Sequence, residues 1–217
     1  EKFFKSSDEE AEPFFNTVIW SGNGSSSRSI TGVGIEPDLV WAKARQAQNH
    51  TLYDSVRGTG KYLTSDGISG ENSSTTYGQL TSFDADGFTG SLGSNGTYSF
   101  FNSSSQTYVA WCWKAGGTAV ANNDGSTTSQ VSANVTNGFS IVKTSSTANA
   151  ITYGHGLDSA PEMIISKGYN SSGWSWFVYH KDMGTGKYLM LNSTATAGNF
   201  AVFSNVTSTT ITSNSSP

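Results

Sequence analysis

The sequence predicts an all-β protein built from two tandem β-sandwich copies of the jelly-roll or lectin-like type, produced by an internal duplication. Three observations carry this prediction: the composition, a set of repeated motifs, and short alternating segments separated by turns. Serine, threonine, asparagine and glycine together supply almost half of the residues, yet 12% of the chain is aromatic. Small polar residues that alternate with aromatic and β-branched residues favour strands and turns over helices.

Composition and charge also exclude several classes of protein. Charged residues make up 13% of the chain and the formal net charge is −4, whereas about 25% of the residues in a typical soluble domain are charged. The few basic residues are scattered, so we expect no nucleic-acid partner and no anionic membrane partner. No apolar run reaches the roughly 18 residues of a membrane span, so we expect no membrane insertion. A single cysteine, Cys112, excludes an internal disulfide framework.

The repeat is the main feature of the organisation. The hexapeptide Gly58–Leu63 recurs unchanged as Gly184–Leu189. Three further pairs of similar segments precede the hexapeptide in the same order in both copies. They are 32–35 with 154–157, 37–43 with 161–167, and 53–54 with 179–180. We therefore expect an acidic lead-in over residues 1–12, copy one over 13–117, a Gly/Asn/Ser/Thr-rich connection over 118–136, and copy two over 137–217. The counterpart of the segment Tyr108–Trp113 would fall beyond Pro217, so we expect copy two to be incomplete and the chain to be a piece of a longer protein.

Each copy contains short segments that alternate apolar and polar residues, with turn signals about every 8–12 residues, as expected for a sandwich. The strands predicted in copy one are 17–20, 39–44, 51–56, 61–64, 79–83, 98–101 and 108–113. Those predicted in copy two are 139–143, 163–167, 174–180, 187–191, 200–203 and 209–212.

Several of these segments resemble a repeated domain of tail-fibre-like virion proteins from marine bacteriophages. The residues that carry the resemblance are Gly138–Val142, Gly154–Leu157, Ala160–Lys167, Trp176–His180, Lys187–Leu189, Leu191–Thr194 and, in copy one, Tyr108–Cys112. Copy one departs from copy two where Val33 replaces His155 and Trp41 replaces Ile165. The resemblance implies a virion or surface setting rather than a particular chemistry, and it implies a homo-oligomer, often a trimer in fibres.

Residues with catalytic potential are few, and each has a structural interpretation. His155 lies between two glycines, and a turn histidine bonded to the backbone is favoured over a general base oriented by Asp158. Cys112 lies between two tryptophans and is expected to pack on the opposite strand face. Asp54 is expected to form an ion pair or a turn with Arg57. We therefore expect no enzyme activity, with an envelope-degrading hydrolase as the remaining catalytic alternative.

The metal and ligand candidates are equally limited. The segments Asp84–Gly87 and Asn122–Gly125 are similar to partial calcium loops, but both lack the glutamate of a complete loop. We therefore expect no cofactor and no metal site, with calcium as the open alternative. Trp41 and Trp174 are the candidate ligand-binding residues, because an indole ring stacks on a sugar ring. Packing in the sandwich core is the competing interpretation of both residues.

Together these observations favour a non-enzymatic virion structural protein of a marine bacteriophage. It would form a tail-fibre, head-fibre or capsid-decoration element that supports host attachment at the surface of the virion. Its expected partners are other virion proteins, copies of itself and a host-surface glycan. The alternative is a carbohydrate-binding module of a cell-surface or extracellular protein.

Overall fold

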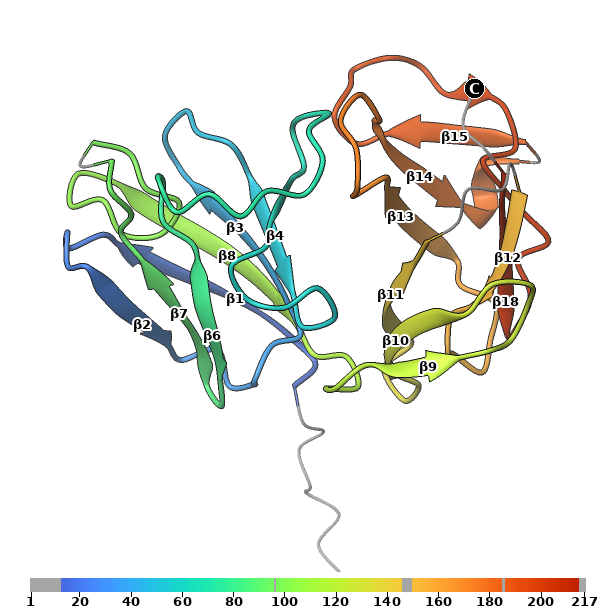
Figure 1. Ribbon diagram of the computed structural model, residues 1–217, viewed down its shortest axis with the longest axis horizontal. Helices are drawn as coiled ribbons and strands as arrows, with labels where there is room; N and C mark the ends of the chain where they lie inside the picture. Colours follow the sequence, from blue (N-terminus) through green and yellow to red (C-terminus); the bar gives the residue numbers. More distant parts are fainter. Residues whose placement is uncertain (1–12, 96, 146–149, 185, 215–217) are drawn as a thin grey trace, which may run out of the picture.

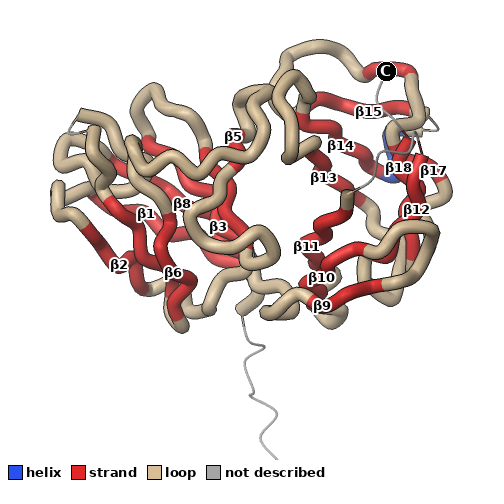
Figure 2. The backbone as a smooth tube through the Cα atoms, viewed as in Figure 1, coloured by secondary structure: helices blue, strands red, loops and turns tan. Residues whose placement is uncertain are grey.

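The computed structural model describes residues 13–95, 97–145, 150–184 and 186–214, so the expected acidic lead-in lies outside the described residues. These residues form two all-β lobes, one from β1 to β8 and one from β9 to β18 (Figure 1). The tube in Figure 2 shows that loops join almost all of the strands directly, with one short helical turn in the second lobe. Within the described residues, no helix is long and apolar enough to span a membrane.

The first lobe contains two antiparallel sheets that pack face to face around a core. The larger has the order β1-β8-β3-β4-β5 and the smaller has the order β2-β7-β6. The strands of the larger sheet are β1 (Phe15–Ser21), β8 (Thr107–Trp113), β3 (Leu39–Ala44), β4 (Thr51–Asp54) and β5 (Leu63–Thr64). Those of the smaller sheet are β2 (Ser27–Thr31), β7 (Gly87–Ser91) and β6 (Leu80–Asp84).

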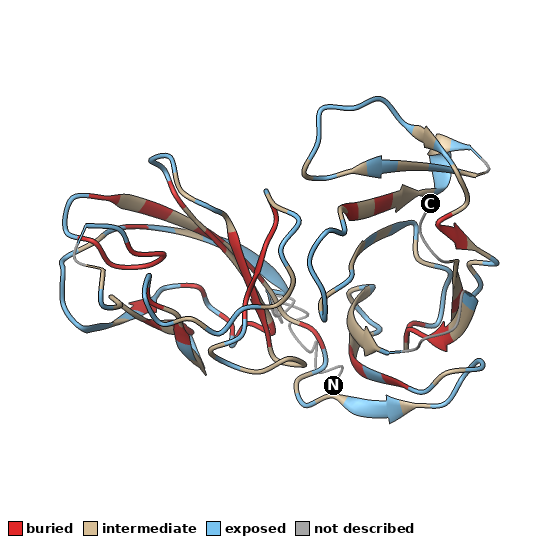
Figure 3. Cartoon of the chain, turned by 45° about the horizontal axis from the view of Figure 1, so that its top comes forward, coloured by how far each residue is buried: buried red, intermediate tan, exposed pale blue. Residues whose placement is uncertain are grey.

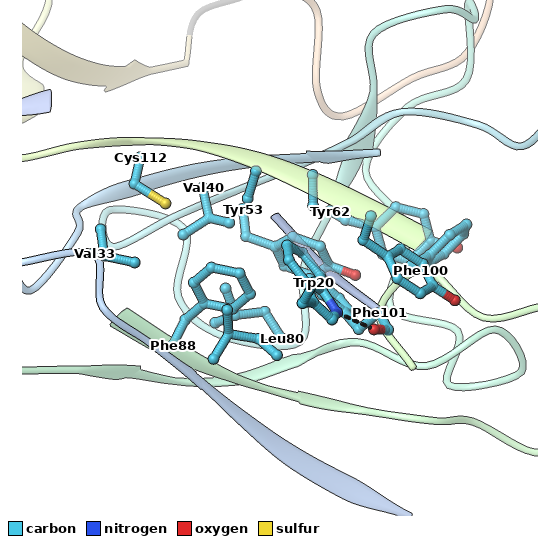
Figure 4. Packing of buried hydrophobic residues seen from close by; sticks show 14 of the residues in the cluster. Trp20, Val33, Val40, Tyr53, Tyr62, Leu80, Phe88, Phe100, Phe101 and Cys112 are labelled. Carbon is cyan, nitrogen blue, oxygen red and sulfur yellow. Dashed lines mark hydrogen bonds between the residues drawn. The ribbon is translucent and has the colours of Figure 1, made fainter. Parts of the chain in front are cut away.

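Aromatic side chains fill the space between these two sheets (Figure 4). Trp20 stacks on Tyr108 with ring centroids 5.2 Å apart, and its indole Nε1 donates a hydrogen bond of 2.7 Å to the carbonyl oxygen of Phe101. Such a bond is what a buried indole requires, because an unpaired polar group in an apolar interior is costly. Alternate residues of β8, namely Tyr108, Ala110 and Cys112, are fully buried here. Part of the high aromatic content of the sequence is therefore explained by the packing of this core.

The second lobe contains three smaller antiparallel sheets, with the orders β11-β10-β9, β12-β18-β17 and β13-β14-β15-β16. The first two comprise β9 (Val120–Asn122), β10 (Ser129–Asn134), β11 (Phe139–Thr144), β12 (Ala150–Gly154), β17 (Phe203–Ser204) and β18 (Thr210–Asn214). The third comprises β13 (Met163–Lys167), β14 (Trp176–His180), β15 (Lys187–Met190) and β16 (Gly198–Asn199), with the helical turn Lys181–Met183 after β14. Its fully buried core is smaller, and Figure 3 shows more exposed and intermediate backbone here than in the first lobe.

Parts of the two lobes share their strand order and register. The orders β2-β7-β6 and β12-β18-β17 correspond, as do β3-β4-β5 and β13-β14-β15. In the first lobe, β3 pairs Trp41 with Leu52. In the second, β13 pairs Ile165 with Val178, which are the residues that the repeated motifs align with that pair. The next strand pairs in the two lobes, β4 with β5 and β14 with β15, also share their register. Leu52 faces Leu63 in the first lobe, and Val178 faces Leu189 in the second.

The lobes contact each other at both ends of their facing sides. At one end, Trp176 packs with Leu52 and Leu63, and its Nε1 donates a hydrogen bond of 2.7 Å to the carbonyl oxygen of Thr64. Loop 68–72 of the first lobe also meets loop 168–173 of the second (Figure 1), and two backbone bonds of 2.6 and 2.8 Å join them. At the other end, the ring of Trp113 stacks on that of Phe139 with centroids 6.2 Å apart.

The strand predictions are confirmed where apolar residues alternate and wrong in two segments. Residues 98–101 form a bend instead of a strand, because the Ser99 hydroxyl accepts the N–H groups of Phe101 and Asn102 and turns the chain there. Residues 200–203 are also irregular, except for Phe203, which begins β17. The strands β2, β7, β9, β12 and β16 were not predicted.

Candidate binding surface

The outer face of β3 and β8 carries a cluster of tryptophans. The inward alternation of β8 leaves Trp111 and Trp113 on the opposite face, as expected from the position of Cys112 between them. Trp41 on β3 lies directly across from Trp111 in the register, with ring centroids 5.9 Å apart and ring planes inclined at 58°. Sheet pairing therefore brings three indoles that are far apart in the sequence onto one surface.

These indoles line a hollow of about 320 Å³ on the side of the first lobe that faces the second. Its lining residues are Trp41, Lys43, His50, Trp111 and Trp113, and we call it the Trp41 hollow. The lining of the hollow therefore combines three indole rings with two basic side chains.

Polar contacts fix several members of the Trp41 hollow in place. The indole Nε1 of Trp41 donates a hydrogen bond of 3.1 Å to Oγ of Ser65. The Asp66 carboxylate accepts the backbone N–H of His50 at 3.1 Å. Burial lowers the pKa of His50, an effect that Asp66 opposes and Lys43 reinforces. His50 is therefore neutral at pH 7 and offers a hydrogen-bond donor and an acceptor to a ligand.

Trp113 has a structural role in addition to its place in the hollow. Its ring lies 4.9 Å from that of Phe15 and also stacks on Phe139 of the second lobe. Trp41 likewise packs against the contact cluster of Leu52, Leu63 and Trp176. The walls of the hollow are thus held by the same contacts that hold the lobes together.

Trp174 lines a second, separate hollow of about 450 Å³ in the second lobe. Its side chain is 40% exposed. The backbone at Gly168 lies so close to this ring that an added Cβ would be 3.2 Å from it, and the Lys167 ammonium donates to the Trp174 carbonyl. The lining residues are Ser172, Gly173, Trp174, Ser175, Phe177, Tyr188 and Met190.

The structure does not bring Trp41 and Trp174 together, because the two hollows share no lining residue. Each predicted ligand-binding residue nevertheless contributes to a surface hollow. The residues that sequence reasoning missed are Trp111, Trp113 and His50. The signal for both tryptophans was already in the alternation of β8, since a buried Cys112 directs its two neighbours outward.

His155 and Cys112, two of the residues considered for catalysis, are buried in the fold. His155 is buried; its Nδ1 accepts the N–H of Leu157 and its Nε2 lies 3.2 Å from the carbonyl oxygen of Thr207. Burial lowers the pKa of His155 and raises that of the Cys112 thiol to about 12. A histidine bonded to the backbone is what the sequence favoured.

Asp54 and Arg57 form the ion pair that was predicted for them. Nε of Arg57 lies 2.5 Å from the Asp54 carboxylate, and both side chains are buried. The same carboxylate accepts the backbone N–H of Arg57, which closes a turn. Arg57 also donates to the carbonyl oxygen of Leu52, so the pair fixes the end of β4.

The partial calcium loop at 84–87 is the turn between β6 and β7. The Asp86 carboxylate accepts the N–H groups of Gly32 and Gly34 at 3.0 and 2.6 Å, and these bonds lower its pKa. Asp84 accepts the hydroxyls of Ser82 and Thr89. Both carboxylates therefore serve the fold. Among the described residues, no group of three or more His, Cys, Asp or Glu side chains is placed to hold a metal ion.

Comparison with known proteins places the sequence of this chain in a family. Residues 10–216 match the model of a domain of unknown function, DUF7483. The chain belongs to the DUF7483 family. No curated protein and no solved structure matches it.

Proposed function

We propose that this DUF7483 chain is a non-enzymatic structural protein of a bacteriophage virion, a tail-fibre, head-fibre or capsid-decoration element, and that it supports host attachment by binding a glycan. The observation that carries the binding part is the Trp41 hollow, in which three indoles meet on one surface of a rigid sheet. The virion part is supported by the resemblance of the repeated segments to phage tail-fibre-like domains.

The chemistry of the Trp41 hollow suits an uncharged sugar. An indole face stacks on the C–H groups of a sugar ring, and the neutral His50 and the Lys43 ammonium supply directional hydrogen bonds at the rim. A volume of about 320 Å³ lies at the lower end of the range for small-molecule sites. We therefore expect one or two sugar rings of a longer glycan to occupy the hollow.

The tandem organisation is part of this proposal. We infer that the lobes are two copies of one duplicated sandwich, the second incomplete. Their shared strand orders support this inference, as does the common register of β3 with β4 and of β13 with β14. A duplicated scaffold presents loops and hollows at a fixed spacing, which suits repeated contacts with neighbours and with a host surface.

A non-enzymatic role is supported by the hydrogen bonds and ion pairs that the titratable side chains considered for catalysis make within the fold. The buried side chains of His155, Asp54 and Arg57 bond to backbone or to each other. A general acid or base has to reach a substrate, and these groups are committed to the fold.

Imaging of the native particle tests the virion part. Cryo-electron microscopy is expected to show this density in a fibre or on a shell, in contact with neighbouring subunits or with copies of itself. Isolated monomers on a cell surface would overturn the virion proposal and favour the second candidate, a carbohydrate-binding module of a cell-surface or extracellular protein.

Binding measurements test the glycan part. We expect the native chain to bind immobilised glycans of bacterial envelopes. The variants Trp41→Ala and Trp111→Ala are expected to bind the same glycans with at least tenfold lower affinity. Ile19→Ala is the matched control, because Ile19 is 72% exposed on β1 and lines neither hollow. Equal binding by native chain and Trp41→Ala would contradict the proposal. Loss in Trp174→Ala alone would move the site to the second hollow.

A further inference from the structure

The strand β11 presents one row of its alternate side chains to the first lobe (Figure 1). Phe139, at its start, stacks on Trp113 of the first lobe. Val142 packs instead in the core of the second lobe. Because successive side chains of a strand point to opposite faces, Ile141 and Lys143 lie on the same face as Phe139 and are directed toward the first lobe.

The neighbouring strand β10 supports this direction. Ser132 lies directly across from Ile141 in the register, so both side chains lie on one face of the sheet. The Ser132 hydroxyl accepts the backbone N–H of Gly116 at 3.0 Å, in the segment that leaves the first lobe after β8. Ile141 is half-buried on this face.

This face of β11 extends between the same two contacts as the Trp41 hollow. At one end, Trp113 lines the hollow and Phe139 stacks on it with ring centroids 6.2 Å apart. At the other end, Trp41 lines the hollow and packs on the contact cluster to which Tyr169 also belongs. The Lys143 ammonium lies over the Tyr169 ring, 5.5 Å from its centroid.

Ile141 lies midway along β11 between these two contacts, and Trp111 lines the hollow on the side of the first lobe. We call Ile141 and Lys143 the second wall. The hollow is thus flanked by indoles of the first lobe and by an aliphatic side chain of the second.

The polar groups near the two walls are hydrogen-bond donors. The Lys143 ammonium is held over an aromatic ring by a cation–π interaction and keeps its N–H groups. The Lys43 ammonium donates to the carbonyl oxygen of Ala44 at 2.9 Å and has further N–H groups. Hydroxyls at the edge of an uncharged sugar ring can accept from both, while the faces of the ring meet the walls.

We propose that one ring of the bound glycan lies between the Trp41 hollow and the second wall, and that this arrangement selects sugars whose ring hydroxyls are all equatorial, such as glucose. The inference rests on the proposed glycan binding and specifies the sugar that the site takes. Both faces of an all-equatorial ring present C–H groups, which suit an indole on one side and an aliphatic side chain on the other.

An axial hydroxyl, as in galactose, makes one ring face polar. Between two apolar walls this hydroxyl loses its hydrogen bonds with water, which lowers the affinity by about tenfold or more. A site with one wall makes no such distinction, because galactose still has one apolar face to stack on an indole. The preference between the two sugars therefore reports the second wall.

Two tetrasaccharides test this inference on the whole 217-residue chain. A tetramer of glucose and a tetramer of galactose, both joined by β-(1→3) linkages, differ only in the orientation of one hydroxyl in each ring. NMR titration is expected to show that the glucose tetramer binds more tightly by about tenfold or more. Isotope-filtered NOEs are expected to connect one bound sugar ring to both the Trp111 indole and the Ile141 methyl groups.

Variants of the second wall provide another arm. Ile141→Ser leaves the three indoles in place but makes the second wall polar, and it is expected to remove most of the preference for glucose. Ile141→Leu keeps an aliphatic wall and is expected to retain that preference. Val135→Ala is the matched control in the same lobe, because Val135 is 45% exposed in the turn after β10 and lines neither hollow. The amide spectrum of each variant checks its fold.

Three results would overturn the inference: equal or tighter binding of the galactose tetramer, no NOE from the bound sugar to Ile141, or binding of neither tetramer by a chain that binds envelope glycans. Envelope-glycan binding is measured on the same samples. If the native chain binds these glycans and Trp41→Ala does not, any of the three results removes the second wall and leaves the proposed function in place. If the native chain binds no glycan at all, the proposed glycan binding fails, and this inference fails with it.

Discussion

The indole Nε1 of Trp176, in the second lobe, donates a buried hydrogen bond of 2.7 Å to the carbonyl oxygen of Thr64, in the first. The same ring packs on Leu52 and Leu63. One side chain thus joins the lobes by both an apolar contact and a directional bond. The Trp41 hollow depends on this joint, because Trp41 belongs to the same cluster.

The first prediction concerns that joint. Trp176→Phe keeps an aromatic ring but leaves the Thr64 carbonyl without its buried partner, which costs about 1–3 kcal/mol of unfolding free energy. Chemical denaturation measures this loss. Trp174→Phe is the control, since Trp174 is exposed and makes no bond of this kind through its indole among the described residues. Equal stability of Trp176→Phe and the native chain would contradict a structural role for the bond.

The buried ion pair leads to a second prediction. Asp54→Ala removes the nearer carboxylate partner of the buried Arg57 guanidinium and leaves it only Glu71, whose carboxylate lies 3.5 Å away. We therefore expect a loss of about 1–3 kcal/mol of unfolding free energy, less than for a buried charge with no partner. Chemical denaturation measures this loss as a lower denaturant midpoint of the variant at an unchanged m-value. Glu162→Ala breaks the exposed pair with Lys181 and is expected to leave the midpoint unchanged. A similar small effect of both substitutions would show that the buried pair does not stabilise the end of β4.

Much of this architecture follows from the sequence where side chains alternate clearly. The predicted ranges of β3 and β13 agree with the structure because apolar residues dominate both segments. β2 and β7 were missed because serine, threonine and glycine fill them, and their strand state comes from pairing with each other. Propensity carries little information in such segments, since tertiary pairing decides.

The candidate site was predictable in part for similar reasons. Trp41 and Trp174 are candidates from the sequence because Trp41 has no counterpart in the second copy and Trp174 lies beside a Ser/Gly loop, although packing in the core competes with this interpretation for both. The convergence of Trp111 on Trp41 depends on the register between β8 and β3, which no local pattern gives. The contact of Trp176 with Thr64 joins residues from different lobes, so it was beyond sequence reasoning.

Buried His155 predicts a pH dependence of stability. Its pKa in the folded chain is lowered by burial, whereas in the unfolded chain it is about 6.5. The unfolded state therefore binds more protons below about pH 6.5, and the unfolding free energy falls as the pH drops through that region. His155→Val, which introduces the residue found at Val33 in the first lobe, is expected to make this decline shallower. His50 has a pKa lowered in the same direction and accounts for a remaining slope. Identical slopes in the native chain and His155→Val would contradict this assignment.

Cys112 provides a probe of opening in the first lobe. Its thiol is fully buried, and burial raises its pKa to about 12. In the folded chain at pH 8, a reagent therefore cannot reach the sulfur, and the reactive thiolate form is scarce. Alkylation by iodoacetamide is expected to proceed only as fast as the core opens, and to become rapid in denaturant. Mass spectrometry follows the reaction. Native labelling as fast as that of a free thiol would show that β8 is not packed as described.

The most direct test of glycan binding is an NMR titration of the indole N–H signals with envelope oligosaccharides. We predict concentration-dependent shifts of the Trp41 and Trp111 signals, while the buried Trp20 in the first core and Trp176 between the lobes remain unchanged. Trp111→Ala should abolish the shift of Trp41. If every indole signal stays in place at saturating oligosaccharide, or if only Trp174 responds, the Trp41 hollow is not the glycan site.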